Sequence, residues 1–161
     1  MKKIAFNKYY VLSCILLAIF LLSCKKIKQF PDIPYIEFVS FTKLNNVSPQ
    51  KGILCVYFTD GDGDIGFKSN ENDTAYNFFI DYYEKQEGVF VKVHLDVTHN
   101  ARIPILNSSG HKKPLEGNIE IEIEYNNYTS PYDTIQFECW LIDRAGNKSN
   151  HIFTPPIIVE K

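Results

Sequence analysis

The sequence lacks the positive charge of a nucleic-acid-binding protein and has few residues suited to metal or nucleophilic catalysis. Its 17 basic residues are outnumbered by 19 acidic ones, giving a formal net charge of −2, whereas a nucleic-acid-binding surface requires an excess of positive charge. The four histidines, His94, His99, His111 and His151, are scattered along the chain, which favours surface positions over a zinc site. We therefore expect no nucleic-acid partner and no enzymatic activity.

Long apolar runs are also lacking, apart from one at the N-terminus that is too short to be a comfortable membrane span. It extends over residues 11–24, "VLSCILLAIFLLSC", and follows the lysines Lys2, Lys3 and Lys8. A basic segment followed by a short apolar one is typical of a secretory signal peptide. The expected organisation is a signal peptide at 1–23, a tether at 24–34 and a folded domain at 35–161.

The end of the apolar run, "LLSC", resembles the lipobox of bacterial lipoproteins, whose cysteine is acylated and begins the mature chain. The resemblance implies that Cys24 is the lipidation site and that the membrane is one partner of the protein. More than one acyl chain anchors a protein stably. The implied location is the outer membrane, on either its periplasmic face or the cell surface. An ordinary leader with an incidental cysteine is the alternative.

A sustained helical period is absent, and short runs of β-branched and aromatic residues recur between Gly, Asn, Asp and Pro. They predict strands near residues 35–42, 52–59, 76–84, 88–95, 118–125, 134–143 and 151–159. Pro155 and Pro156 predict an edge position or a break in the last strand. Seven short strands in about 125 residues favour an all-β, antiparallel two-sheet sandwich.

The stretch "DTIQFECWLIDRAGNKSN", residues 133–150, resembles the penultimate strand and following turn of Ig-like and fibronectin type III-like modules. Together, "LLSC", "FTDGDGDIGF", "RIPIL", "PLEGNI" and "DRAGN" resemble small Bacteroidetes-type lipoproteins with an Ig-like domain. The resemblance implies an Ig-like sandwich of about seven strands, and it supports the fold more than any function.

Acidic residues are concentrated in the stretch "YFTDGDGDIGF", where Asp60, Asp62 and Asp64 alternate with glycines. Ca²⁺ takes six to eight oxygen ligands, and glycine-spaced carboxylates can surround one ion. The pattern is half of an EF-hand loop, but Ile65 stands where that loop requires glycine. We therefore predict a structural calcium site in a sandwich loop at 60–66. A tight turn without an ion is the alternative, since Asp and Gly are the commonest turn formers.

Asp143 and Asn147 are expected to contribute further ligands to this calcium site. The second and penultimate strands of such a sandwich end near one another, which would bring both residues to the 60–66 loop. Glu71 and Asp73 are weaker candidates.

Two cysteines lie outside the leader, Cys55 and Cys139. Their neighbourhood beside Trp140 resembles that of the inter-sheet disulfide of antibody-type domains, and export permits oxidation. The alternation of apolar residues instead points Cys139 inward and Cys55 outward. A disulfide and two free thiols both remain open.

Aromatic side chains provide the remaining sign of a ligand. Trp140, Tyr82 and Tyr83 are candidates for stacking on a sugar ring, although such rings also fill cores and sheet faces. The function expected from the sequence is a membrane-anchored, non-catalytic binding or accessory module of the cell envelope. The alternatives are a glycan-binding or small glycan-active protein and a structural subunit of an outer-membrane complex.

Overall fold

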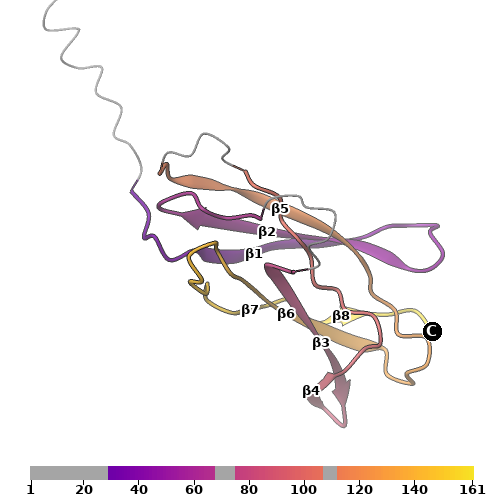
Figure 1. The fold of residues 1–161 in the computed structure, drawn as a ribbon. Coiled ribbons are helices and arrows are strands. Elements are labelled where there is room, and N and C mark those ends of the chain that lie inside the picture. Colours follow the sequence, from indigo (N-terminus) through magenta and orange to yellow (C-terminus); the bar gives the residue numbers. More distant parts are fainter. Residues whose placement is uncertain (1–28, 68–74, 107–111) are drawn as a thin grey trace, which may run out of the picture.

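The computed structural model describes residues 29–67, 75–106 and 112–161 and contains eight strands in these ranges (Figure 1). They are β1 (Tyr35–Lys43), β2 (Lys51–Asp60), β3 (Phe78–Gln86), β4 (Val89–Val93), β5 (Leu115–Glu124), β6 (Thr134–Leu141), β7 (Ile152–Phe153) and β8 (Ile157–Ile158). Within these ranges no helix is long and apolar enough to cross a membrane. The predicted leader, Cys24, Glu71 and Asp73 lie outside the described residues.

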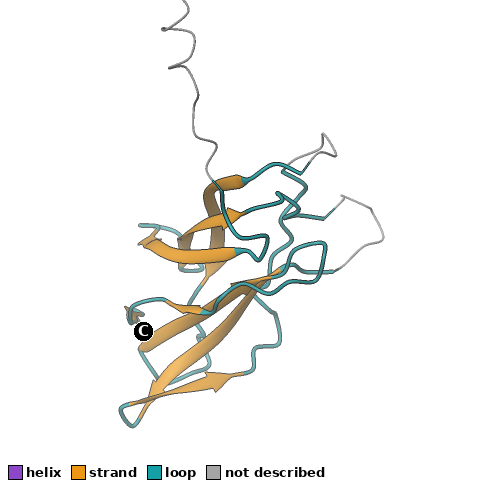
Figure 2. Cartoon of the chain, turned by 90° about the vertical axis from the view of Figure 1, so that its left-hand side faces the viewer, coloured by secondary structure: helices purple, strands orange, loops and turns teal. Residues whose placement is uncertain are grey.

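The strands form two antiparallel sheets that lie one above the other (Figure 2). One sheet has the order β1-β2-β5, and the other has the order β4-β3-β6-β7, with β8 also paired to β6. The predicted all-β antiparallel sandwich is therefore confirmed.

The core lies between the sheets, and β3 and β6 supply alternate residues to it. In β6, Ile135, Phe137, Cys139 and Leu141 are fully buried, while the residues between them are half-buried. This is the period of two that a strand with one core-facing side requires. Leu54, Val56 and Phe58 supply the same layer from β2. Burial of each such side chain contributes about 1.5–3 kcal/mol.

The last predicted strand, 151–159, is divided into β7 and β8, both of which pair with β6. Pro155 and Pro156 lie between them and cannot donate a ladder hydrogen bond. The expected break is therefore confirmed. The other six predicted strands correspond to β1–β6 with ends shifted by a few residues.

Cys55 and Cys139 are both buried and both carry free thiols, so the disulfide that the sequence left open is not formed. Cys55 is in register with Glu120 and stands between Leu54 and Val56, which belong to the core. Strand alternation therefore turns Cys55 to the outer side of its sheet. Burial raises the pKa of both thiols, that of Cys139 to about 12.

Candidate metal centre

The candidate site is the loop that follows β2, which ends at Asp60. Gly63 and Gly66 have φ angles of +70° and +95°, a region that disfavours other residues. A Cβ atom at Gly63 would overlap the carbonyl oxygen of Lys113, and one at Gly66 would overlap that of Pro104. The glycines thus let the loop pack closely against two distant backbone segments.

Three carboxylates converge inside this loop. One carboxylate oxygen from each of Asp60, Asp62 and Asp64 lies within 4.8 Å of the other two. Asp60 is fully buried, and the other two residues are half-buried. The Oδ1 atoms of all three are inaccessible to solvent and have no hydrogen-bond partner among the described residues. Because a buried acceptor without a donor is costly, this arrangement favours a cation.

The second oxygen of each carboxylate is held by the protein. Asp60 Oδ2 accepts hydrogen bonds from the backbone N–H groups of Asp64 (2.8 Å) and Ile65 (3.3 Å). Asp64 Oδ2 accepts one from the backbone N–H of Ala145 at 3.1 Å. Asp62 Oδ2 accepts one from Lys112 Nζ, also at 3.1 Å. These bonds fix the carboxylates, while every Oδ1 remains available to an ion.

Burial and the charge of neighbouring carboxylates disfavour the ionised forms of Asp60 and Asp64. Burial, followed by the negative charge of Asp62, raises the pKa of Asp60 to about 6. Burial and the charge of Asp143 raise the pKa of Asp64. A bound cation would have the opposite effect on these pKa values, because its positive charge favours the ionised carboxylates. The charge distribution is therefore unfavourable for a loop alone and suitable for a divalent ion.

The turn at 143–147 lies against the loop, but Asp143 and Asn147 bond to each other. Asp143 Oδ1 accepts from the Asn147 backbone N–H at 2.7 Å, and Oδ2 accepts from Asn147 Nδ2 at 2.8 Å. Asp143 is buried and adds negative charge next to Asp64. Three of the five expected ligands therefore converge, while Asp143 and Asn147 form the adjacent turn and their ligation of an ion stays a prediction.

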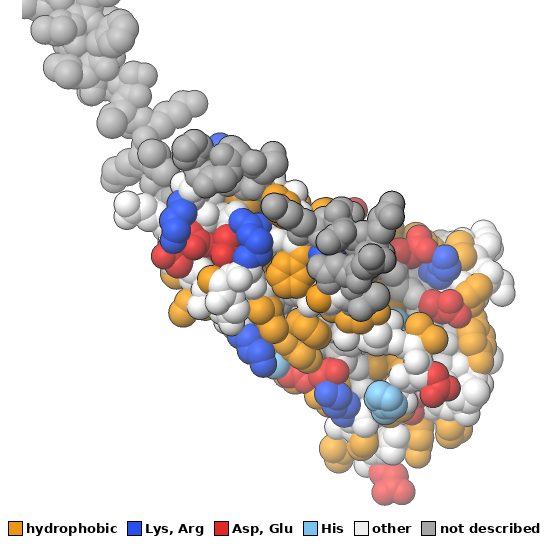
Figure 3. Space-filling model, in the orientation of Figure 1, with side chains coloured by type: hydrophobic (Ala, Val, Ile, Leu, Met, Phe, Trp, Pro, Cys, Tyr) orange, Lys and Arg blue, Asp and Glu red, His pale blue; other side chains and the backbone are white. Residues whose placement is uncertain are grey.

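Lys112 and Pro31 complete the surroundings, and sequence reasoning missed both. Lys112 forms an ion pair with Asp62, and the carbonyl of Pro31 accepts a hydrogen bond from Gly61 N at 2.8 Å. In Figure 3, acidic and basic side chains intermingle at this end of the molecule, near the start of the described chain. No local motif signals these contacts, since Lys112 is 50 positions from its partner.

Tyr82, a candidate for sugar stacking, belongs to the core. It is only 3% exposed, and its ring packs against Phe137 and His99. The alternation of β3 sends Tyr82 inward together with Ile80. The interpretation of Tyr82 as a ligand-stacking residue is therefore wrong.

Trp140 and Tyr83 lie on the outer face of the β4-β3-β6-β7 sheet. The Trp140 ring is parallel to Phe79 at 5.3 Å and to His151 at 4.7 Å, and these residues flank it on opposite sides. Both faces of the indole are therefore covered. The Tyr83 hydroxyl donates to Glu138 at 2.5 Å, and its ring contacts Phe153. Trp140 therefore presents no open face for a sugar, which corrects the expectation for that residue, while stacking on Tyr83 stays a prediction.

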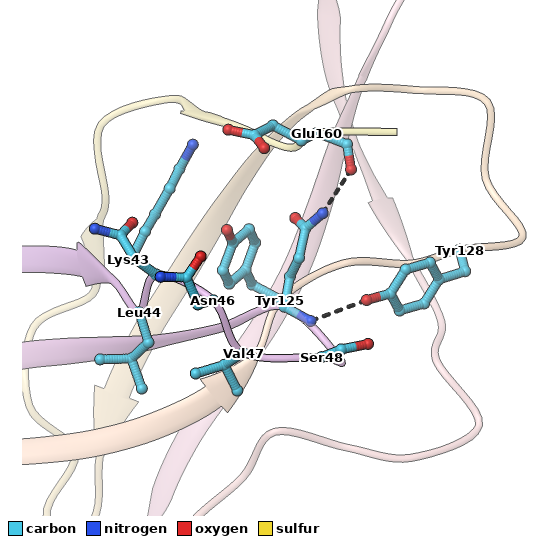
Figure 4. A pocket seen from close by; sticks show the side chains of 10 residues that line it. Lys43, Leu44, Asn46, Val47, Ser48, Tyr125, Tyr128 and Glu160 are labelled. Atoms are coloured by element: carbon cyan, nitrogen blue, oxygen red, sulfur yellow. Dashed lines mark hydrogen bonds between the residues drawn. The ribbon is translucent and has the colours of Figure 1, made fainter.

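A cavity of about 710 Å³ lies at the opposite end of β2 from the aspartate loop. Figure 4 shows Lys43 and Leu44 on one side of it, Tyr128 on the other and Tyr125 between them. The Tyr128 hydroxyl accepts a hydrogen bond from Gln50 N at 2.9 Å, and Gln50 Nε2 donates to the Glu160 carbonyl at 2.7 Å. The cavity is thus polar, with tyrosines in its wall.

Comparisons with protein-family models, with curated proteins and with solved structures gave no match for this chain. The fold and the site define a class in structural terms. It is an antiparallel two-sheet sandwich with a cluster of one buried and two half-buried carboxylates that begins at the end of its second strand.

Proposed function

We propose that the protein is a membrane-anchored, non-catalytic accessory module of the cell envelope whose 60–66 loop binds a structural calcium ion. The observation that carries the ion site is the buried Asp60, whose Oδ1 atom has no hydrogen-bond partner among the described residues and whose carboxylate lies in one cluster with those of Asp62 and Asp64. The anchor rests on the lipobox resemblance at Cys24, and the leader "VLSCILLAIFLLSC" supports export.

Calcium suits this group better than other common metals. The converging residues are all carboxylates, which are the ligands of hard cations, whereas zinc is usually held by histidine or cysteine. Mg²⁺ demands near-octahedral geometry and keeps several waters, while Ca²⁺ accepts irregular oxygen sets. Calcium sites of extracellular modules have dissociation constants of about 10⁻⁴–10⁻³ M. An ion held this weakly would have a structural role.

The contacts of the loop indicate what the ion would stabilise. The loop bonds to the 112–113 segment through the Asp62 carbonyl, and to the 143–147 turn through the carbonyl and carboxylate of Asp64. Arg144 Nη1 also donates to the carbonyl of Gly66 at 3.1 Å. An ion that neutralises the carboxylates would therefore hold together segments far apart in the sequence.

Calorimetric titration of Ca²⁺ into the full chain in detergent tests this proposal. We expect binding in the range given above, its loss in Asp60→Asn, and its retention in Asp96→Asn, a matched substitution at an exposed aspartate outside the loop. Absence of binding by the wild-type chain, or equal binding by Asp60→Asn, would refute the calcium site.

Glycan binding is the second candidate, and the cavity at the far end of β2 favours it. Its wall combines the tyrosines Tyr125 and Tyr128 with amide, hydroxyl and carboxylate groups that can bond sugar hydroxyls. Titration with neutral oligosaccharides, followed by NMR, would perturb resonances around Tyr128 in the wild-type chain and not in Tyr128→Ala. Perturbation confined to other surfaces, or none at all, would exclude this cavity as a glycan site.

A further inference from the structure

The N-terminal segment lies directly on the aspartate loop. Gly61 N donates a hydrogen bond to the Pro31 carbonyl at 2.8 Å. A Cβ atom at position 61 would overlap the carbonyl oxygen of Phe30, so the two backbones are in close contact. The contact precedes β1, whose pairing with β2 begins with Tyr35 opposite Thr59. The segment is therefore held to the domain by the loop before it enters the sheet.

Gly61, which donates the hydrogen bond to the N-terminal segment, stands between two of the converging carboxylates. Asp60 and Asp62 flank Gly61 in the sequence, and both contribute an oxygen to the group within 4.8 Å. The backbone that carries the Gly61 N–H group is thus flanked by two carboxylates, each with an oxygen no more than 4.8 Å from one of the other. A cation between them would fix that separation, while their unneutralised charges would increase it.

Lys112 couples the same loop to the N-terminal segment through charge. Its Nζ atom bonds Asp62 Oδ2 at 3.1 Å, and Asp62, followed by Asp32, raises the pKa of the Lys112 ammonium. Asp32 belongs to the N-terminal segment and follows Pro31 directly. Acidic groups from both partners of the contact therefore act on one lysine, Lys112. Neutralisation by a divalent ion would relieve the repulsion between them.

From these contacts we propose that calcium in the 60–66 loop is a latch, which locks the N-terminal segment onto the domain and releases it when the ion leaves. This inference rests on the proposed calcium site and assigns that site a regulatory consequence. By linkage, docking of the segment and binding of the ion strengthen each other by the same factor.

The latch would set the distance between the domain and its anchor. Pro31 is seven residues after Cys24, a stretch that can span at most about 25 Å. When the contact at Gly61 opens, the first residue held by the sheet is Tyr35, and the maximum reach becomes about 40 Å. Calcium would thus hold the loop end of the sandwich towards the membrane, with the cavity at the other end of β2 directed away from it.

Hydrogen exchange of the full chain in detergent, in Ca²⁺ and in chelator, tests the latch. The Gly61 amide is the most informative reporter because it is the donor to Pro31. We expect Ca²⁺ to slow exchange of this amide about 5- to 150-fold, the usual range of coupling between two sites. Labelling of Ile33→Cys, an exposed position, gives a second readout, since a spin label there should become less mobile in Ca²⁺.

A pair of glycine substitutions separates the latch from the ion site. In Gly61→Ala, the added methyl displaces Phe30 while all carboxylates remain, so Ca²⁺ should still bind, with an affinity about fivefold or more weaker. The spin label in this variant should be mobile with or without calcium. Gly117→Ala is the control, because its methyl meets Phe58 only at ordinary contact distance, 3.5 Å.

The outcomes distinguish the two proposals. Calcium binding with slower exchange at Gly61 and a restrained label supports the latch. Calcium binding that slows exchange of the Asp64 amide but leaves Gly61 and the label unchanged overturns the latch and leaves the ion site intact. Absence of calcium binding overturns both.

Discussion

Asp60 and Asp64 are joined by a hydrogen bond of 2.8 Å from the Asp64 backbone N–H to Asp60 Oδ2, while the Oδ1 atoms of both residues are buried without a donor among the described residues. The bond alone would be a sufficient reason for an aspartate at position 60, since Asp side chains commonly bond backbone groups in turns. The unpartnered oxygens are not explained by a turn. They are the feature that distinguishes an ion site from a tight connection.

The Asp60→Asn variant tests this distinction through stability. Asparagine keeps an oxygen for the Asp64 N–H and removes a buried charge, so in chelator at pH 7.5 we expect it to be about 1–3 kcal/mol more stable than wild type, given a pKa near 6 for Asp60. In saturating calcium the advantage should shrink or reverse. Urea unfolding of the two proteins, in chelator and in calcium, measures these differences in the free energy of unfolding. If Asp60→Asn were less stable than the wild type by the same amount in chelator and in calcium, Asp60 would have only a turn-forming role.

The raised pKa of Asp60 also predicts a dependence of stability on pH. Its folded-state pKa of about 6 lies above the usual 3.9 of an unfolded aspartate, so the folded state binds more protons between these values. Without calcium, stability should therefore fall as the pH rises from about 4 to about 6, by up to about 3 kcal/mol from this group. Unfolding in chelator at a series of pH values tests whether stability falls as the pH rises. The part of this fall that Asp60 contributes should be absent in Asp60→Asn.

Calcium binding should show the opposite dependence on pH. Because the ion requires ionised carboxylates, its affinity should be lower at pH 5 than at pH 7.5, and binding at pH 5–6 should release protons. Calorimetry in buffers of different ionisation enthalpy measures the number released. An affinity that does not change with pH would contradict the participation of Asp60.

The two thiols of the sandwich should be unreactive in the native state. Cys139 is fully buried with a pKa of about 12, and Cys55 is also buried with a raised pKa. The reactive thiolate is therefore scarce at both positions. Alkylation followed by peptide mapping should label Cys55 and Cys139 only after unfolding. Recovery of a peptide pair linked by a disulfide would contradict the separation of their side chains by the sheet.

Trp140 provides a spectroscopic test of the outer sheet face, because it is the single tryptophan of the chain. Its indole is covered by Phe79 and His151. Replacing His151 by alanine should open one face to water, shift the emission to longer wavelength and cost about 0.5–1.5 kcal/mol. The matched control His94→Ala changes an exposed histidine away from Trp140 and should leave the emission unchanged. An unchanged spectrum in His151→Ala would contradict the stacked arrangement.

The elements that could be predicted are those with a local pattern. The alternation in "TIQFECWL" specifies the core-facing side of β6, and the adjacent prolines specify the break between β7 and β8. The same alternation correctly placed Cys55 and Cys139 on different sides of their sheets. The spacing of Asp60, Asp62 and Asp64 likewise selected the carboxylates that converge, because residues this close in sequence need only a short loop to meet.

The features that could not be predicted depend on the packing of distant segments. Whether Asp143 offers its oxygens to an ion or to Asn147 depends on the conformation of the turn, and Asp-Arg-Ala-Gly-Asn permits either. Tyr82 and Tyr83 have the same chemical character, and only the phase of β3 decides which of them enters the core. The contact of Gly61 with Pro31 has no local signature in either segment.

The thermal unfolding midpoint of the full chain, measured in 10 mM calcium and in chelator, tests the central claim most directly. With a dissociation constant of about 10⁻⁴–10⁻³ M, mass action at this concentration stabilises the folded state by about 1.4–2.7 kcal/mol. For a domain of this size, that corresponds to an increase in midpoint of about 5–10 °C. The account predicts this increase in the wild-type chain and its absence in Asp60→Asn. Identical midpoints of the wild-type chain in calcium and in chelator would contradict it and reduce "DGDGD" to a turn.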